Sequence, residues 1–339
     1  MIEDIENLDL ILDNTKADTK FNAELSLRPK LLNEYVGQNL LKEQLRVMLS
    51  SASSRKAVLD HILFFGMPGV GKTTLAQILA NELGVKIIVT SGQALDKTGD
   101  VAAILANIKE GDVLFIDEIH RLRPKVEELL YTAMEDFAID IVLGKGPTAK
   151  LLRLDLPKFS LFGATTRLHS VSNPLKDRFG LVAKISDYEL CDIETIVRLN
   201  ANKLEVSIHD KAVERLAKIC RLTPRIANHY LKRARDFAIN DNSSIVSLEV
   251  VEKLMTSLGL DDLGLNENDR NIISKIYNDF SAGPVGLSTL SASMNEDPDT
   301  MNEIFEPYLI RLGLIKRSNR GRLLTTKGIE FVHKYGLIN

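Results

Sequence analysis

Cysteine and long apolar runs are scarce in this sequence, and each scarcity excludes a class of protein. The 339 residues contain two cysteines, Cys191 and Cys220, too few for a disulfide framework or a cysteine-rich zinc site. We therefore expect reduced thiols in a cytoplasmic protein. No apolar run reaches the roughly 18 residues of a membrane span, and the acidic N-terminus lacks the basic segment of a signal peptide.

An excess of positive charge is also lacking, because 43 Lys and Arg stand against 46 Asp and Glu, a formal charge of −3. This balance excludes a uniformly basic nucleic-acid binder but allows a local basic patch. Hydrophobic residues make up 45% of the chain, which excludes global disorder. A chain of this length holds two or three domains of ordinary size. Residues 1–20 are polar and acidic, and we expect them to form a flexible tail.

Short apolar runs alternate with helix-like stretches in the first half of the chain. The runs 61–65, 85–90, 113–117 and 159–166 are rich in branched and aromatic residues, which is typical of buried strands. Stretches with helical periodicity lie between them. Strands that alternate with helices predict an α/β domain with a mostly parallel sheet covered on both faces.

Residues 138–156 interrupt this alternation. Two apolar stretches flank a Gly- and Pro-containing turn at 144–147, which predicts a β-hairpin, and its length suggests that the hairpin projects from the sheet. Leu152 and Leu154 share one face at the strand period of two residues. They either pack on the core or form an apolar docking edge for a partner.

Residues 66–73 read Gly-Met-Pro-Gly-Val-Gly-Lys-Thr and match the phosphate-binding pattern G-x-x-x-x-G-K-[ST]. Small residues let successive backbone N–H groups wrap around phosphates, and the following helix points its positive N-terminus at the anion. We expect Lys72 to hold the β- and γ-phosphates and Thr73 to bind Mg²⁺. The sequence therefore predicts ATP and Mg²⁺ as ligands.

The run 113–117 ends in Asp117, and Glu118 follows it directly. In open α/β sheets, ligands bind at the carboxyl ends of the strands. We expect Asp117 to support Mg²⁺ coordination and Glu118 to polarise the attacking water, since hydrolysis needs metal and water held in line with the γ-phosphate. A solvated acidic turn is the alternative, which the nearby phosphate loop disfavours.

The chain becomes helical after residue 188, and residues 266–339 have the outline of a winged helix, with three helices followed by a short basic hairpin. Residues 311–334 contain seven Lys or Arg and one Glu. Such clustering is typical of phosphate contact, although a solvated basic face is the alternative. Gly321 allows a tight turn in the hairpin. No array typical of base readout is present, so gripping independent of sequence is expected.

Five segments resemble the AAA+ ATPases, and four resemble more narrowly the RuvB family of bacterial Holliday junction branch-migration motors. The AAA+ segments are 64–76, 113–122, 162–167, 174–180 and 223–228, and the RuvB segments are 27–38, 130–147, 163–167 and 306–322. The resemblance implies an α/β fold in which an AAA+ P-loop domain is followed by a small helical lid and a winged-helix head. The implied bounds are a tail at 1–20, an ATPase domain at 21–188, a lid at 189–260 and a DNA-binding head at 261–339.

The resemblance also assigns residues around the nucleotide. Thr166 resembles the polar sensor near the γ-phosphate, with Thr165 as the second choice, and Arg225 resembles the second sensor. The implied contacts are Leu27 and Arg28 against the adenine, Gly69, Gly71, Lys72, Thr73 and Thr74 at the phosphates and Mg²⁺, Glu135, Asp136 and Phe137 close to the nucleotide, and Tyr188 beside the base.

Arg178 lies in a short segment between Pro174 and Gly180, where an exposed arginine paired with an acid is the ordinary interpretation. The family places this arginine at the subunit rim, where it reaches the γ-phosphate of the neighbour. A guanidinium there stabilises the transition state by about 10³–10⁵ in rate. Such contacts need a head-to-tail interface that closes into a ring, and the family implies a homohexamer.

The resemblance implies that Arg317 and Arg322 contact DNA, that the hairpin at 138–156 docks the junction-binding partner RuvA, and that RuvC is a further partner. We therefore interpret the chain as an ATPase that promotes branch migration of Holliday junctions in recombination and repair. Two other classes remain open: an ATP-switched DNA-binding regulator, and a clamp-loader-like AAA+ protein that remodels another protein.

Overall fold

The computed structural model describes residues 27–143 and 150–338, which divide into two compact units. Unit 1 comprises the described residues up to Glu205 together with Thr223–Asn228, and unit 2 comprises Val206–Leu222 and the described residues from His229 onward. The predicted tail at 1–20 lies outside the described residues. Within the described ranges, every helix is too short or too polar to cross a lipid bilayer.

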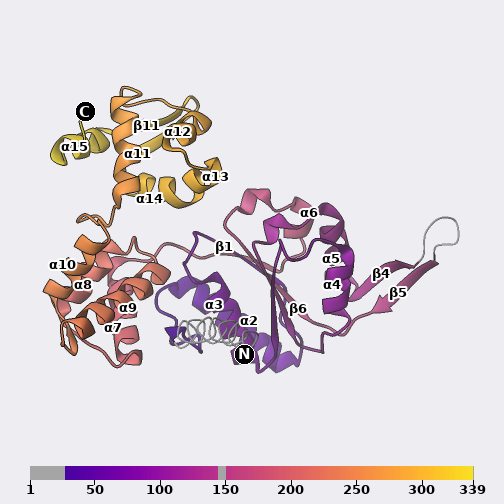
Figure 1. The fold of residues 1–339 in the computed structure, drawn as a ribbon. Helices are drawn as coiled ribbons and strands as arrows, with labels where there is room; N and C mark the ends of the chain where they lie inside the picture. The colour runs from indigo at the N-terminus through magenta and orange to yellow at the C-terminus, as the bar shows by residue number, and fades with distance from the viewer. Residues whose placement is uncertain (1–26, 144–149, 339) are drawn as a thin grey trace, which may run out of the picture. The chain divides into compact units, whose positions relative to one another are not determined.

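Unit 1 is built on a five-stranded sheet in the order β2-β3-β6-β1-β7 (Figure 1). Each strand pair is parallel, as the alternating pattern predicts. Phe64, Phe115 and Phe162 lie on the three central strands and are fully buried, because both faces of the sheet are covered. The strands are β1 (Ile62–Phe65), β2 (Ile87–Ser91), β3 (Val113–Asp117), β6 (Ser160–Thr165) and β7 (Leu181–Lys184).

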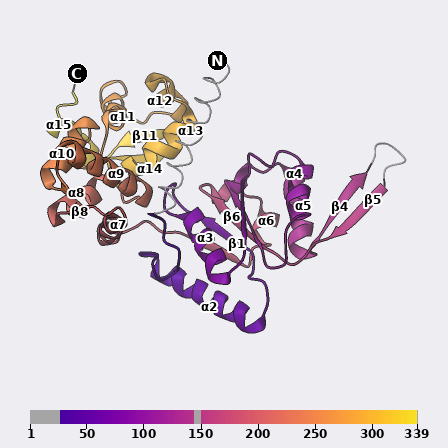
Figure 2. The same ribbon diagram turned by 60° about the horizontal axis from the view of Figure 1, so that its bottom comes forward.

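Helices cover the sheet on both sides, with α2 and α3 on one side and α4 and α5 on the other (Figures 1 and 2). Gly84 ends α3 in the left-handed conformation with φ of +68°, which glycine adopts without strain. Pro124 opens α5 at a position where the missing N–H has no helical partner. The helices are α2 (Asn39–Arg55), α3 (Lys72–Leu83), α4 (Thr98–Leu105), α5 (Pro124–Glu135), α6 (Asn173–Lys176) and α7 (Leu190–Lys203), with 3₁₀ turns η1 (Ile119–Arg121) and η3 (Leu168–Ser170).

The predicted hairpin is present as the antiparallel pair β4 (Ala138–Leu143) and β5 (Lys150–Asp155). It extends away from the sheet of unit 1 in both views (Figures 1 and 2). The predicted turn at 144–147 lies outside the described residues. Leu154 packs against the core of the sheet, whereas Leu152 is 48% exposed. Leu154 therefore follows the core alternative, whereas Leu152 is left exposed and a docking role for it stays a prediction.

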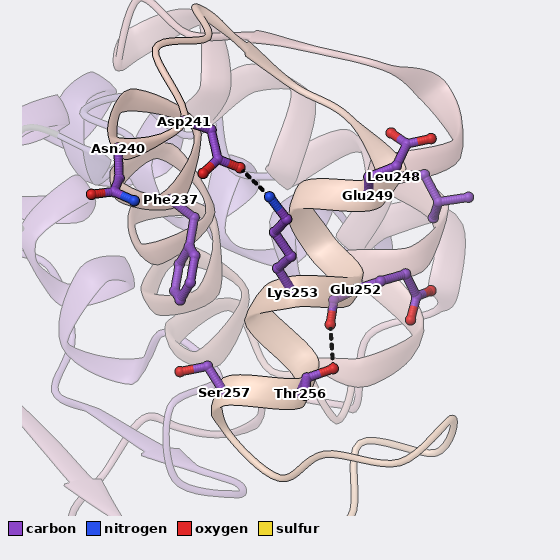
Figure 3. A pocket seen from close by; sticks show the side chains of 9 residues that line it. All are labelled: Phe237, Asn240, Asp241, Leu248, Glu249, Glu252, Lys253, Thr256 and Ser257. Atoms are coloured by element: carbon purple, nitrogen blue, oxygen red, sulfur yellow. Dashed lines mark hydrogen bonds and ion pairs between the residues drawn. The ribbon is translucent and has the colours of Figure 1, made fainter.

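Unit 2 begins with a helical region that contains α8 (Asp210–Ile219), most of α9 (Pro224–Asn240) and α10 (Leu248–Ser257), with a short parallel pair of β8 (Ser207–Ile208) and β9 (Ile245–Val246). A hollow of about 800 Å³ opens between α9 and α10 (Figure 3). Phe237 and Leu248 contribute apolar walls, and Lys253 pairs with Asp241 at 2.6 Å. The lining contains none of the residues predicted to bind nucleotide or DNA.

The rest of unit 2 is a winged helix with its own apolar core. The predicted three helices and hairpin are present, and a helix that the sequence did not predict, α15, follows the hairpin. Gly321 has φ of +131°, and a Cβ there would overlap the Val285 carbonyl. The elements are α11 (Glu267–Asn278), α12 (Leu287–Met294), α13 (Pro298–Thr300), the π-helical turn η4 (Met301–Phe305), α14 (Glu306–Arg311), β10 (Ile315–Ser318), β11 (Gly321–Leu324) and α15 (Thr326–Lys334).

A buried ion pair joins the two parts of unit 2. Arg221, just after α8, donates to the fully buried carboxylate of Asp269 on α11 at 2.5 Å. The Arg221 guanidinium also lies over the ring of Tyr308, 5.0 Å from its centroid. The intervening segment is packed as well, since Leu265 is fully buried. The helical region and the winged helix therefore share a specific internal contact.

Candidate nucleotide site and DNA-contact wing

The phosphate loop lies between β1 and α3, and its glycines are required by close packing. Gly69 and Gly71 have φ of +78° and +102°, which disfavours other residues. A Cβ at Gly69 would lie 2.8 Å from the Thr223 methyl and 3.2 Å from the Arg225 Cβ, and one at Gly71 would lie 2.8 Å from the Tyr35 hydroxyl oxygen. The loop thus needs glycine at both positions, as a backbone cradle for a phosphate group would.

Lys72 is the first residue of α3, and the N-cap before it, Gly71, provides no side-chain cap. The first N–H groups of the helix are therefore available to an anion. The Lys72 ammonium donates to the carbonyl oxygens of Gly66 and Met67 at 2.9 and 3.0 Å. Thr73 and Thr74 follow it on the first turn of α3, half-buried.

Several charged groups act on Lys72. Burial lowers the pKa of its ammonium, the carboxylates of Asp117 and Glu118 raise that pKa again, and the guanidinium of Arg225 lowers it. These groups come from α3, the end of β3 and the first turn of α9. The structure therefore brings together the predicted lysine, both carboxylates and the second sensor, which is the arrangement that a nucleoside triphosphate with Mg²⁺ requires.

The two carboxylates at the end of β3 have different surroundings. Asp117 accepts from the Glu118 backbone N–H at 3.0 Å. One oxygen of Glu118 lies 3.3 Å from Nδ1 of His120, whose side chain is 7% exposed. Nδ1 also lies 2.9 Å from the Thr165 hydroxyl at the end of β6. Burial is the largest of the effects that lower the pKa of His120 to about 4, so the ring is neutral at neutral pH.

The two candidate sensor threonines have different roles in the structure. The Thr165 hydroxyl accepts from the Arg167 backbone N–H at 2.9 Å and contacts His120. The Thr166 hydroxyl is buried and has no hydrogen-bond partner among the described residues. A buried hydroxyl without a partner loses the free energy of a hydrogen bond unless a ligand supplies one. This favours Thr166 as the sensor.

Tyr188 lies under the phosphate loop, where its hydroxyl is 3.1 Å from the Val70 carbonyl oxygen and 3.0 Å from the Tyr35 hydroxyl, between which its single proton can be shared. Tyr35 itself donates to the same carbonyl at 3.2 Å. Burial raises the pKa of Tyr188 to about 12 and that of Tyr35 well above its ordinary value. Both phenols therefore stay protonated and fix the shape of the loop.

The remaining residues assigned near the nucleotide contact other parts of unit 1. Leu27 is 2% exposed, and its carbonyl accepts from Lys203 at 3.3 Å, while Arg28 is half-buried. The segment Glu135, Asp136 and Phe137 ends α5. Its described contacts are salt bridges to Arg178 and Arg153, at 3.1 and 2.9 Å, and ring packing of Phe137 on Phe159 and His61.

Arg178 follows α6 and contacts α5. Its Nη2 lies 3.1 Å from the Glu135 carboxylate, its Nη1 donates to the Pro174 carbonyl at 2.7 Å, and its guanidinium carbon lies 4.6 Å from the ring centroid of Tyr131. Arg178 is thus paired with an acid, as the ordinary interpretation of the sequence has it. These contacts also hold the guanidinium in one defined place.

The wing arginines lie on the hairpin β10–β11 and share a buried acid. Glu306, whose side chain is 2% exposed, accepts from Arg322 at 2.6 and 3.1 Å and from Arg317 at 2.6 Å. Arg317 also donates to Asn302 at 2.6 Å. The side chain of Arg317 is 51% exposed and that of Arg322 is 15% exposed. Arg317 is therefore the more accessible of the two to a phosphate.

Sequence reasoning missed Tyr35, His120, Tyr131 and Glu306, which contact the predicted site residues. The sequence could have indicated His120, because it lies only two residues after the predicted site residue Glu118. No local sequence pattern could have indicated Tyr35 and Glu306, because their partners Val70 and Arg322 are 35 and 16 residues away. The structure alone supplies these contacts.

Three family models match consecutive parts of the chain. The model described as the Holliday junction DNA helicase RuvB P-loop domain matches residues 27–185, the RuvB AAA lid domain matches 188–261, and the RuvB C-terminal winged helix domain matches 262–333. Among solved structures, the Thermotoga maritima RuvB Holliday junction branch migration motor is similar, with 44% identity over 91% of this chain and 98% of that chain and a TM-score of 0.83. A mutant of T. maritima RuvB is 45% identical with the same coverage and TM-score.

Proposed function

We propose that this chain, which belongs to the RuvB family, is an ATP-driven DNA motor that promotes branch migration of Holliday junctions. The observation that carries the proposal is the grouping of Lys72, Asp117, Glu118 and Arg225 around a glycine cradle, in one chain with a winged helix. In this proposal, ATP hydrolysis at the nucleotide site supplies the free energy, and the winged helix contacts the substrate, duplex DNA.

Binding of ATP is assigned to the loop and to α3. The backbone N–H groups of the loop, which Pro68 lacks, would surround the phosphates, and the Lys72 ammonium would exchange the loop carbonyls for the β- and γ-phosphates. Thr73 and Asp117 would hold Mg²⁺, which would neutralise charge on the phosphate oxygens. Thr74 lies on the same turn of α3, and Tyr188 and Tyr35 hold the loop from below.

Hydrolysis is assigned to Glu118, whose carboxylate would accept a hydrogen bond from the attacking water, orient it toward the γ-phosphate and take its proton. Thr166 donates its unpartnered hydroxyl to the same phosphate, and Arg225 adds positive charge from α9. Arg178 acts on the nucleotide of a neighbouring subunit, which requires a closed head-to-tail ring. We assign that ring as a homohexamer from the family.

DNA contact is assigned to the wing, where Arg317 meets phosphate and Arg322 supports it. Phosphate contacts carry no sequence information directly, which suits a motor that moves along any DNA. The exposed Leu152 on the hairpin β4–β5 offers an apolar surface for RuvA, and RuvC joins the complex by family analogy.

The test is a branch-migration assay on a synthetic four-way junction, with and without RuvA. We expect ATP-dependent movement that RuvA stimulates, and Lys72→Ala as control should abolish it. ATPase activity without junction movement under any condition would contradict the motor and favour a protein-remodelling AAA+ ATPase. Tight binding to one DNA sequence only would favour an ATP-switched regulator.

A further inference from the structure

One face of α5 carries three side chains at a spacing of four residues, Glu127, Tyr131 and Glu135, which places them in a row along the helix. This row meets the segment that leads through α6 to Arg178. Glu127 is buried, whereas the Glu135 side chain is 57% exposed. Tyr131 lies between them.

The buried end of the row joins α5 to α6. Glu127 accepts from the Tyr131 hydroxyl at 2.9 Å and from the Ser172 hydroxyl at 2.6 Å. Ser172 is also the N-cap of α6 and accepts from the Leu175 backbone N–H. Hydrogen bonds to a charged, buried acceptor are among the stronger ones in proteins. The Tyr131 ring is therefore fixed relative to the start of α6.

The guanidinium of Arg178 lies over the face of this tyrosine ring. The guanidinium carbon lies 4.6 Å from the ring centroid, within the range of a cation–π contact. Nε of Arg178 is buried and has no hydrogen-bond partner among the described residues. The ring thus limits the rotation of the side chain, while the exposed Glu135 carboxylate is a partner that a phosphate can replace.

We propose that Tyr131 is a positioning residue for Arg178, holding its guanidinium in the orientation that reaches the nucleotide of the neighbouring subunit. The inference rests on the proposed ring and on the trans role of Arg178. Tyr131 does not touch the nucleotide of its own subunit in this scheme. Its effect therefore passes through Arg178 and appears at the neighbour's site.

The first test compares steady-state ATPase activity of full-length rings. Tyr131→Leu removes the ring face and should lower kcat about 10- to 100-fold, because a misplaced catalytic group loses that order of rate, with little change in ATP affinity. Tyr131→Phe keeps the ring face but loses the hydroxyl bond to Glu127, so its kcat should lie between those of Tyr131→Leu and the wild type. Glu128→Ala, at an exposed position of α5, is the matched control and should behave as wild type.

A double mutant separates positioning from a general structural role. If Tyr131 acts through Arg178, Tyr131→Leu should lower kcat no further in the Arg178→Ala background. A further loss of 10-fold or more in that background would overturn the inference. Tyr131→Met, flexible and without a ring face, is the second variant should Tyr131→Leu not form rings.

Mixed rings decide whether the defect lies in trans. Lys72→Ala subunits lack a working phosphate loop but keep Tyr131 and Arg178. Mixing them with Tyr131→Leu subunits should raise the ATPase rate per Tyr131→Leu subunit, since an intact arginine then faces an intact phosphate loop at some interfaces. Arg178→Ala subunits are mixed with Lys72→Ala in parallel, and native mass spectrometry confirms that the rings are mixed.

Recovery for both variants supports the inference. Recovery for Arg178→Ala without recovery for Tyr131→Leu overturns the inference and leaves the proposed function intact, because the tyrosine then acts on the site of its own subunit. No recovery for either variant, in confirmed mixed rings, contradicts the trans arginine itself and overturns both.

Discussion

The backbone of Glu118 adopts a left-handed conformation with φ of +49°. This costs a residue with a side chain about 1–2 kcal/mol, and it turns the chain from β3 into the 3₁₀ turn η1. The turn places the carboxylate next to His120 and within electrostatic range of Lys72. A strained residue at the carboxyl end of a central strand is consistent with the assignment of the general base.

Glu118→Gln tests that assignment. The amide keeps the shape of the side chain and leaves Lys72, Thr73 and Asp117 in place, so ATP binding should persist. Hydrolysis should fall by 10²-fold or more, because the water loses its general base. ATP binding by fluorescence titration and steady-state phosphate release measure the two effects, with Lys72→Ala as the control that loses binding. Near-normal ATP turnover by this variant would mean that Glu118 is not the general base.

His120 gives the protein a dependence of stability on pH. Burial is the main cause of its lowered pKa, with Arg121, Arg167 and His169 also lowering it and Asp117 raising it. In the unfolded chain the pKa returns to about 6.5. At pH values between the folded and unfolded pKa of His120, the unfolded state binds more protons than the folded state. The free energy of unfolding therefore falls as pH falls from about 6.5 toward 4.

The predicted size of this loss is up to about 3 kcal/mol at the low end of the range. Urea unfolding at pH 7.5, 6.0 and 5.0 measures it in the wild-type protein and in His120→Gln, which has no titrating group at this position. The difference in unfolding free energy between the two proteins should change with pH in favour of the variant as pH falls. A constant difference would mean that His120 does not stay neutral in the fold.

At the scale of elements, the basic surface of the hairpin β10–β11 packs on a buried acid, Glu306. Glu306 opens α14, directly after the π-helical turn η4, and its buried carboxylate holds one arginine from each strand of the hairpin. Arg317 and Arg322 are direct partners in the register of the two strands. Without the acid, two like charges would face each other across the hairpin.

The two wing arginines should consequently give different mutant effects. Arg317→Ala should reduce the slope of log K against log salt for duplex DNA by about 0.9, equally on unrelated sequences, with little loss of stability. Arg322→Ala leaves the buried Glu306 with one partner fewer and should cost about 3 kcal/mol of unfolding free energy. Affinity across a salt series and thermal unfolding measure these effects.

Basal ATPase activity without DNA is the control for both wing variants and should be unchanged. An unchanged salt slope for Arg317→Ala would mean that this arginine makes no contact with DNA phosphate and belongs only to a solvated basic face. A loss of affinity confined to one DNA sequence would favour the operator-binding regulator.

At the scale of the whole molecule, unit 2 joins a helical region to the DNA-contact wing through Arg221 and Asp269. The carboxylate of Asp269 is fully buried, and burial raises its pKa despite the opposing effect of the arginine. A buried acid needs its partner, because an uncompensated charge in the interior is costly. The contact is therefore expected to couple the unfolding of the two regions.

Arg221→Ala should cost about 3–5 kcal/mol of unfolding free energy and should separate one thermal transition of unit 2 into two. The matched control is Arg215→Ala, which removes an arginine paired with the exposed acids Glu252 and Asp262. Exposed pairs contribute about 1 kcal/mol or less, so this control should change little. Differential scanning calorimetry measures both, and equal effects of the two substitutions would mean that the buried pair does not join the regions.

The sequence by itself determined those parts of the protein that are encoded by contiguous residues. The phosphate loop at 66–73, the carboxylates at the end of β3, the described strands of the hairpin at 138–143 and 150–155 and the basic wing all have their expected local conformation. Each rests on a short pattern whose conformation is decided by backbone sterics and apolar periodicity. The strand β7 escaped prediction, since its apolar run is only three residues long and ends at Lys184.

Only the tertiary structure decided which side chains meet across long stretches of sequence. The parallel neighbours β3 and β6 bring His120, just after β3, against Thr165 at the end of β6, whereas the Thr166 hydroxyl, one residue beyond the strand, has no hydrogen-bond partner among the described residues. Helix α5 brings Tyr131 to Arg178, 47 positions later in the chain, and α14 brings Glu306 to the wing. Such contacts depend on strand order and helix packing, which local patterns do not specify.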